Sequence, residues 1–330
     1  MYLYEWGFQW SKKLMTYEES IEAAKKRQGQ PGLTELNAPD GIQESVSKSV
    51  YDNDSLYAYN DTYIDLRTPN DEKRGLITIF LGGIGWLVFY PLVATAYISI
   101  TRIFAGFYSV EDPINWSEYF FLIGFPLFFW GMLFIYLKYA FRYLRLESFT
   151  ARRIIVRFNR ITRKVYLLRP KYLGGIRIMD WDKAEVVIDK NMTELDGTGG
   201  FVIVAWDKSN GADQQGNPTD DMEAAFVGKP TRNASELLAF WEYIRRYMED
   251  GPAAAPPPKK LISKFPWPWN SFKAAWGLDT RFLQHSGLWV FVLINVLLLP
   301  VVLIHGTGHW LSLLLCYEPR FPRVIEEAGR

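Results

Sequence analysis

Two long runs without a charged side chain constrain this chain more than any other feature of its sequence. No Asp, Glu, Lys or Arg occurs in residues 75–101, and none occurs in residues 119–137. As helices, both runs are long enough to cross a hydrocarbon core, for which about 20 residues suffice. The connector, residues 102–118, is too short for a folded domain. We therefore predict a transmembrane helical hairpin over residues 75–140; the alternative is a hairpin buried in a soluble protein.

The charged residues that flank the two runs predict the orientation of the hairpin. Lys73 and Arg74 precede the first run, whereas the connector contains one basic and three acidic residues. The second run is followed by five basic residues, Lys138, Arg142, Arg145, Arg152 and Arg153. Because Lys and Arg concentrate on the cytoplasmic side of membrane proteins, we expect a multi-pass membrane protein with its soluble domain in the cytoplasm. The connector then faces the outside, which is the periplasm if the host is a Gram-negative bacterium.

Charge balance and cysteine content exclude several classes of protein. The 330 residues carry 37 basic and 36 acidic side chains, and aromatic residues are not interleaved with a basic stripe, so nucleic acid is not an expected partner. The single cysteine, Cys316, excludes an internal disulfide and a cysteine-rich zinc site. His305 and His309 would share a helical face with it, but Gly306 and Gly308 weaken a helix there. Since no phosphate loop, nucleophile elbow or paired-carboxylate motif occurs, we predict no metal, no cofactor and no enzymatic activity.

Short alternating segments replace the long apolar runs after the hairpin. They predict strands at residues 148–158, 164–169, 176–181, 184–188, 201–206 and 224–227. A strong amphipathic helix follows, with Asn233 or Ser235 as its cap. Its apolar stripe consists of Leu237, Phe240, Trp241, Ile244 and Met248. We predict an α+β fold with transmembrane helices, in which residues 141–250 form a small antiparallel β-domain, pleckstrin-homology-like in the preferred version, closed by this helix.

Residues 1–74 are expected to pack on this β-domain as an N-terminal cytoplasmic segment. Residues 1–10 are aromatic but lack the basic and continuous apolar regions of a signal peptide. Thr16 and Glu19 have the spacing of a capping box, which predicts a short helix to about residue 27. Residues 47–50 and 63–67 are strand-like and would pair with the sheet of the β-domain.

The C-terminal quarter combines a linker with a second apolar segment. Residues 251–280 are rich in Pro and Trp, and the first ten predict a semi-rigid linker. No Asp, Glu, Lys or Arg occurs in residues 282–317, so residues 281–330 are predicted to be membrane-associated. Residues 288–304 are long enough to span, with Pro300 as a kink and residues 306–308 as an interruption. The chain then either crosses once, leaving its C-terminus outside, or forms a bent re-entrant hairpin and returns.

Charges are distributed unevenly over the β-domain, with basic residues before residue 178 and acidic ones after it. Such charges are either ordinary solvated faces or binding surfaces. In the second case the membrane-proximal residues contact anionic lipid headgroups, and the candidates are Arg142, Arg145, Arg152, Arg153, Trp267 and Trp269. The acidic loops then meet a basic partner, and the candidates are Asp207, Asp213, Asp220, Asp221 and Glu223.

Four segments resemble the DUF6708 family: residues 156–160 (VRFNR), 162–166 (TRKVY), 180–181 (DW) and 241–249 (WEYIRRYME) ahead of Gly251-Pro252. The resemblance extends over about residues 45–330. It implies a bacterial membrane protein of a family that is often encoded beside type VI secretion effectors and includes cognate immunity proteins. The implied role is inhibition of a toxin by binding, with similarity to the immunity partner of a nuclease effector of the TseT type.

Two functions are therefore expected from the sequence. The first is a membrane-anchored immunity protein whose partners are the cognate effector toxin and membrane lipids. A nuclease effector needs a basic cleft for phosphates, and an acidic surface is suited to fill it. The second is a lipid-binding or assembly protein of the secretion system, which would use the basic membrane-proximal strands and the Trp-rich segment.

Overall fold

A computed structural model describes residues 2–329 except 13, 15, 20, 23–40, 70–73, 109–113, 189–199, 220, 232, 277–292 and 295. The chain forms two compact units. The helical unit comprises Lys73–Thr150 and Trp267–Cys316. The sheet unit comprises Tyr2–Glu72, Ala151–Pro266 and Tyr317–Arg330. Each unit is therefore assembled from segments that are far apart in the sequence.

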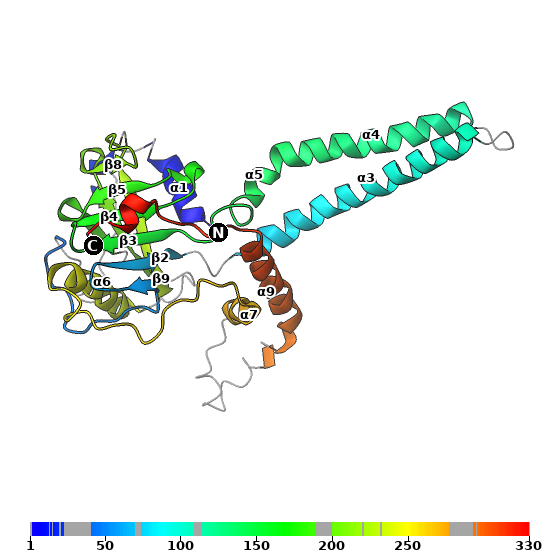
Figure 1. Cartoon of the computed structure of the whole chain (residues 1–330). Helices are drawn as coiled ribbons and strands as arrows, with labels where there is room; N and C mark the ends of the chain where they lie inside the picture. Colours follow the sequence, from blue (N-terminus) through cyan, green and yellow to red (C-terminus); the bar gives the residue numbers. More distant parts are fainter. Residues whose placement is uncertain are drawn as a thin grey trace. The chain divides into compact units, whose positions relative to one another are not determined.

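The helical unit contains the hairpin that the uncharged runs predict (Figure 1). Its two long helices are α3 (Leu76–Tyr108) and α4 (Trp116–Tyr139), and the shorter helices are α5 (Phe141–Leu144), α7 (Pro268–Trp276) and α9 (Leu299–Leu314). Both long helices contain a proline, Pro91 in α3 and Pro126 in α4. The predicted helical hairpin is confirmed, and its helices extend several residues beyond the uncharged runs.

Polar contacts at both ends hold α3 and α4 together. Near the start of α3, the Tyr136 hydroxyl donates a hydrogen bond to the Leu81 carbonyl at 2.9 Å. The tyrosine ring lies against Gly85, where a Cβ would come within 2.9 Å of it. At the other end Arg102 Nε lies 2.6 Å from Glu118 Oε1. Gly85 is therefore needed for the close approach of the tyrosine ring, and the two helices are paired along most of their length.

The sheet unit contains two antiparallel sheets, as the alternating segments predict (Figure 1). The larger has the order β1 (Leu56–Tyr59), β2 (Tyr63–Arg67), β3 (Ile155–Asn159), β4 (Lys164–Leu168), β5 (Arg177–Asp180) and β8 (Gly211–Asp213). The smaller has the order β6 (Glu185–Ile188), β7 (Gly200–Trp206) and β9 (Glu223–Thr231). The helices of this unit are α1 (Leu3–Ser11), α6 (Ala234–Glu249) and α10 (Arg323–Glu326), with single 3-10 turns at Lys171–Leu173, Trp181–Lys183 and Lys208–Asn210.

Several strand boundaries differ from the sequence prediction. The strand predicted at 148–158 begins only at Ile155, because Phe149 has a φ of 58° and interrupts an extended backbone. Residues 47–50 form no strand, and the edge strand is β1 instead. The polar loop that follows β7 contains the short strand β8, paired with β5. The helix predicted to reach residue 27 lies partly outside the described residues, although Thr16 and Glu19 make both capping-box hydrogen bonds.

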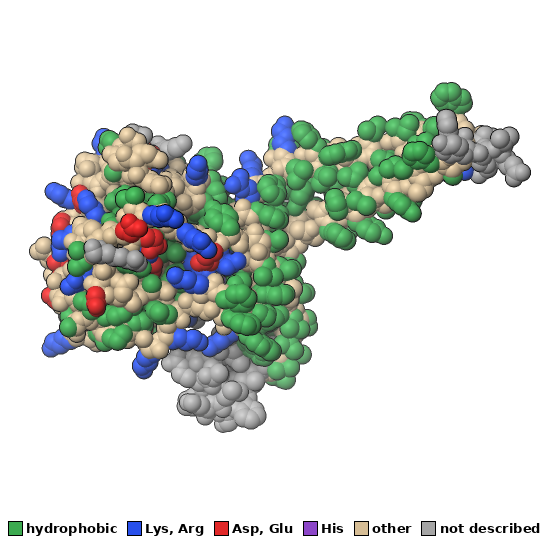
Figure 2. Space-filling model, in the orientation of Figure 1, with side chains coloured by type: hydrophobic (Ala, Val, Ile, Leu, Met, Phe, Trp, Pro, Cys, Tyr) green, Lys and Arg blue, Asp and Glu red, His purple; other side chains and the backbone are tan. Residues whose placement is uncertain are grey.

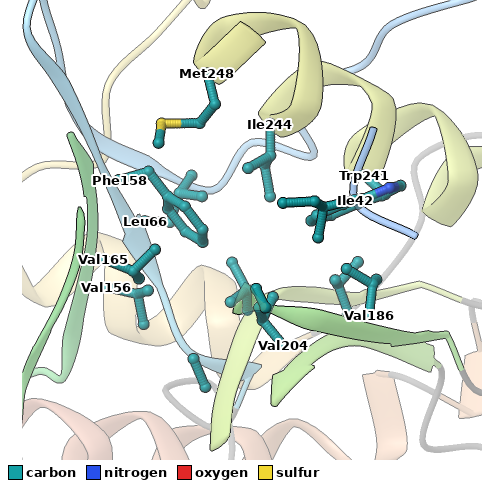
Figure 3. Packing of buried hydrophobic residues seen from close by; sticks show 14 of the residues in the cluster. Ile42, Leu66, Val156, Phe158, Val165, Val186, Val204, Trp241, Ile244 and Met248 are labelled. Atoms are coloured by element: carbon teal, nitrogen blue, oxygen red, sulfur yellow. The ribbon is translucent and has the colours of Figure 1, made fainter. Parts of the chain in front are cut away.

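One core joins both sheets to α6 (Figure 3). The predicted stripe of α6 is buried, with Trp241 and Ile244 facing residues of the large sheet such as Phe158 and of the small sheet such as Val204. The opposite face of the large sheet carries a second cluster, which Phe321 of the C-terminal tail helps to form. Both faces of β4 are buried, which explains its nearly continuous apolar sequence. A strand with one solvated face would instead alternate apolar and polar residues.

Two segments of the C-terminal part of the chain pack on the sheet unit. The Tyr59 hydroxyl donates to the Ala255 carbonyl at 2.9 Å and that of Tyr243 to the Pro256 carbonyl at 3.0 Å, so the start of the predicted linker is packed on the sheet unit. The Arg152 amide donates to the Tyr317 carbonyl at 2.7 Å. The tail is therefore part of the sheet unit, and the number of times that residues 281–330 cross a membrane stays a prediction.

Candidate functional site

The hairpin exposes apolar side chains along both of its long helices. None of the 24 residues of α4 is buried, and large side chains such as Phe120 in α4 and Trp86 in α3 are exposed. Figure 2 shows hydrophobic side chains along the surface of the hairpin. By length and composition, α3 and α4 are both able to cross a membrane. An apolar helix surface of this extent needs an apolar environment, since exposed patches of this kind mark membrane or protein contacts. The hairpin is therefore a candidate membrane anchor.

A buried carboxylate holds the beginning of this anchor. Glu147 Oε2 accepts hydrogen bonds from the amides of Gly75 and Thr78, both at 2.9 Å, and from the Thr78 hydroxyl at 3.0 Å. The Ser148 hydroxyl lies 2.8 Å from that of Thr78. A carboxylate here satisfies free amides of the first turn of α3 and is favoured by the helix dipole. The segment after α4 therefore caps the helix that begins the hairpin.

The histidine and cysteine side chains tie helices together within the helical unit. His305 Nε2 lies 3.1 Å from the Arg74 carbonyl, and His309 Nδ1 lies 2.9 Å from the Ser271 hydroxyl. Cys316 Sγ donates to the Glu147 carbonyl at 3.2 Å. Within the described residues, no group of three or more His, Cys, Asp or Glu is placed to hold a metal ion. These three residues thus have observed packing roles.

One expectation about α9 is wrong, because the helix runs without interruption through Gly306 and Gly308. Pro300 lies in its first turn, and a turn at Leu298 separates α9 from the helical residues 296 and 297, where the kink was predicted. A Cβ at Gly308 would lie 2.5 Å from the Gly75 carbonyl oxygen, and one at Gly306 would lie 2.3 Å from the Phe272 ring. The glycines are needed because α3 and α7 approach α9 closely. The predicted span 288–304 lies partly outside the described residues.

The basic candidates for membrane contact divide into two kinds. Arg142 and Arg145 are exposed, and the Arg142 guanidinium lies over the Tyr143 ring at 4.7 Å. Arg152 and Arg153 instead reach Glu318 Oε2 at 3.3 and 3.0 Å.

Arg153 is buried, lies over the Tyr57 ring at 4.7 Å and donates to the Lys264 carbonyl at 2.6 Å. Arg152 and Arg153 therefore hold the C-terminal tail, which corrects their assignment as headgroup contacts. Trp267 and Trp269 are exposed, as membrane contact requires.

The acidic candidates for partner contact also differ in how far their carboxylates are buried and paired within the protein. Glu223 is buried and pairs with Arg169 at 2.8 Å and Arg177 at 3.3 Å, with Lys12 Nζ at 3.6 Å. Its carboxylate is structural, which corrects its assignment as a partner contact. Asp207 accepts from the Lys208 amide at 2.7 Å and caps a 3-10 turn.

Asp213 closes the turn after β8. It accepts hydrogen bonds from the amides of Gln215 at 2.8 Å and Asn217 at 2.9 Å. Hydrogen bonds from the Asn217 side chain, followed by those of the backbone, lower the pKa of the Asp213 carboxyl. Asp220 lies outside the described residues. Asp221 has a 46% exposed side chain and lies 3.4 Å from Lys12, so it is the candidate best placed to meet a partner.

The sequence did not indicate that the N-terminal helix lies beside Asp221. Tyr4 packs its ring on Phe201 at 4.7 Å between centroids, and Phe8 packs edge-on to Phe226 at 6.0 Å. These contacts attach α1 to β7 and β9.

Attachment of α1 leaves Trp10 67% exposed and Leu14 83% exposed. Since Lys12 lies between them in sequence and pairs with Asp221, we call Trp10, Leu14 and Asp221 the N-terminal surface. The aromatic content of residues 1–10 was the only signal in the sequence for this surface.

Comparison with known proteins gives one match. A family model described as "Family of unknown function (DUF6708)" matches residues 132–330, more than half of the chain. No curated protein matches, and no solved structure matches. The match begins within α4 and includes every strand from β3 to β9, as well as α6, α9 and the tail.

Proposed function

The chain belongs to the DUF6708 family, and we propose that it is a non-enzymatic, membrane-anchored immunity protein that binds and neutralises a type VI secretion effector. The single observation that carries the anchoring is the exposed apolar surface of α3 and α4. The flanking basic residues favour insertion with the sheet unit in the cytoplasm of a bacterium and the connector across the inner membrane. The role in immunity is the one that the family resemblance implies.

The distribution of buried charges supports binding as the task of the sheet unit. Asp65 receives two hydrogen bonds from Arg157, at 2.7 and 2.9 Å, and Glu223 is surrounded by basic side chains. Glu242 pairs with Arg245 and Arg246 at 2.8 and 2.7 Å on α6.

The pairs of Asp65 and of Glu223 each join different elements, and Glu242 also accepts hydrogen bonds from the Ser45 hydroxyl and the Val46 amide, which join α6 to the N-terminal segment. They give the domain a rigid surface on which a partner can dock without reorganisation.

The N-terminal surface is the preferred contact for the effector. Tryptophan is enriched among the residues that dominate binding energy, and the exposed Trp10 belongs to α1, whose Tyr4 and Phe8 rings pack on the sheet unit. Asp221 supplies a negative charge 3.4 Å from Lys12, two residues after Trp10. An effector that acts on nucleic acid presents a basic cleft, and Asp221 would increase the rate of encounter with it. Trp10 and Leu14 would then provide most of the affinity.

Co-purification tests this proposal with the intact chain extracted in mild detergent. The toxin encoded beside the gene should co-purify with the wild-type protein. The double variant Trp10→Ala and Leu14→Ala should weaken binding by at least about tenfold and abolish protection of cells that express the toxin. Val324→Ala is the matched control, because Val324 is also an exposed apolar residue of the sheet unit. Equal binding by wild type, control and double variant would remove the N-terminal surface from the mechanism.

The alternative function is that of a lipid-binding or assembly protein of the secretion system. The exposed Trp267 and Trp269, together with Arg142, favour it, because tryptophan and arginine are suited to the headgroup layer. The two functions differ in their genetic consequence. Deletion of an immunity gene harms cells only when the toxin is present, whereas deletion of an assembly protein reduces secretion whether or not the toxin is present.

A further inference from the structure

The apolar surface of α9 is not explained by the hairpin. α9 contains no Asp, Glu, Lys or Arg, and it exposes Val301, Leu303, Ile304, Leu311 and Leu314. Its 16 residues give a length of about 24 Å, which is less than the roughly 30 Å of a hydrocarbon core. The helical residues 296 and 297 precede α9, but a turn at Leu298 separates them from it. As a straight helix, α9 is therefore too short to cross a membrane along its own axis.

The contacts of α9 place it at the level where the hairpin begins. Gly308 lies against the Gly75 carbonyl and the Ile79 side chain, and His305 lies against the Arg74 carbonyl. All three partners are in, or directly before, the first turns of α3. From this point α9 leaves in a direction different from that of α3 and α4 (Figure 1). Its exposed apolar side chains are therefore close to the entry of the hairpin and not beside its far end.

Helix α7 gives this part of the unit a polar and aromatic border. It packs on α9 through Phe272, and the Ser271 hydroxyl lies 2.9 Å from His309 Nδ1. On its outer side Trp269 is 80% exposed and Lys273 is exposed. Tryptophan and lysine beside an apolar surface are typical of helices that lie in the headgroup region.

We propose that α7 and α9 form an in-plane foot, which inserts its apolar side into the leaflet where the hairpin begins and does not cross the membrane. The occupants of its surface are phospholipid acyl chains around Leu303 and Leu311 and headgroups around Trp269 and Lys273. The foot is continuous with the candidate anchor, and the chain after α9 enters the sheet unit at Tyr317. The proposal rests on the membrane anchoring described above but not on the role in immunity.

Depth-dependent fluorescence quenching tests the foot in the full-length protein. The wild-type chain is the blank, because its single cysteine, Cys316, is buried. A bimane label on Leu303→Cys, in vesicles of phosphatidylethanolamine and phosphatidylglycerol, should be quenched at least twofold more by lipid with a nitroxide at acyl carbon 5 than at carbon 12. Phe128→Cys, near the middle of α4, should show the reverse order. Val324→Cys, on the sheet unit, should be quenched by neither lipid.

Two results would overturn the foot. Stronger quenching of Leu303→Cys by the deep nitroxide would show that α9 crosses, and no quenching by either lipid would show that a protein surface or water covers it. Leu311→Cys repeats the measurement about two turns further along α9, in case Leu303→Cys does not fold. If Phe128→Cys is also unquenched, the anchor itself fails, which distinguishes that outcome from failure of the foot alone.

Discussion

Helices α4 and α6 both contain large aromatic side chains but have opposite environments. In α4 no residue is buried, whereas in α6 ten of the 16 residues are buried. Both contain tryptophan, and the difference lies in the arrangement of apolar residues around the helix. α6 has one apolar stripe and a charged side, so its partner is the protein core. α4 is apolar all round, so its environment must be apolar on every side, as in a lipid bilayer.

The largest expected effect compares one tryptophan from each helix. Trp241 of α6 is fully buried beside Trp181, with 5.7 Å between ring centroids. Replacement of Trp241 by Ala should lower the free energy of unfolding by about 3–5 kcal/mol, because it leaves a large cavity. Thermal unfolding of the detergent-solubilised chain, followed by near-UV circular dichroism, measures the change. Trp130→Ala in α4 is the control and should leave this transition unchanged; equal losses would contradict the comparison.

A second test places one charge in each helix. Phe128→Arg in α4 should oppose membrane insertion by about 2.5–3.5 kcal/mol, the cost of an arginine at the centre of a spanning helix. The variant should become extractable from membranes by alkaline carbonate. Ser235→Arg, at an exposed position in α6, should remain in the membrane fraction like the wild type. Retention of Phe128→Arg in the carbonate pellet would indicate that α4 is not surrounded by lipid.

The features that the sequence predicted correctly depend on residues close together in the chain, and those that it missed depend on residues far apart. The hairpin and the stripe of α6 were predicted because their signals are local, repeating within a few residues. The role of Arg153 was missed because its partner Glu318 is 165 residues away. Glu223 was predicted to contact a partner because Arg169 and Arg177, which pair with it in the structure, lie on other segments. The N-terminal surface depends on rings of α1 meeting rings of β7 and β9, which no local pattern reveals.

The carboxyl group of Glu242 on the charged side of α6 allows the stability of this helix to be tested by pH. Burial acts to raise the pKa of Glu242, but hydrogen bonds from Arg245, Arg246, Ser45 and the Val46 amide outweigh it and lower the pKa to about 2. The lowered pKa contributes stability above the unfolded value of about 4.3, on the order of 3 kcal/mol, which is lost as the pH falls toward 2. The difference in Tm between wild type and Glu242→Gln should therefore narrow between pH 5 and pH 3. A constant difference would show that the ion pairs do not stabilise the folded state.

Helix α9 is intermediate between α4 and α6, because one of its sides is packed and the other is exposed. It gives the smallest expected effect. A Cβ at Gly308 would lie 2.5 Å from the Gly75 backbone oxygen, and backbone at this position has no flexible side chain to move away. Gly308→Ala should therefore displace α9 from α3 at a cost of about 1–3 kcal/mol, as overpacking does.

The displacement caused by Gly308→Ala would loosen the bond between His305 and the Arg74 carbonyl and the cap that Glu147 makes on α3. Protease sensitivity of the segment around residue 75 should rise, while the core transition of α6 stays at the wild-type temperature. Gly82→Ala is the matched control, because a Cβ there meets no atom within 4 Å. If Gly308→Ala behaves like Gly82→Ala, the close packing of α9 on α3 does not stabilise the helical unit, and α9 is held by its contacts with α7 and by lipid.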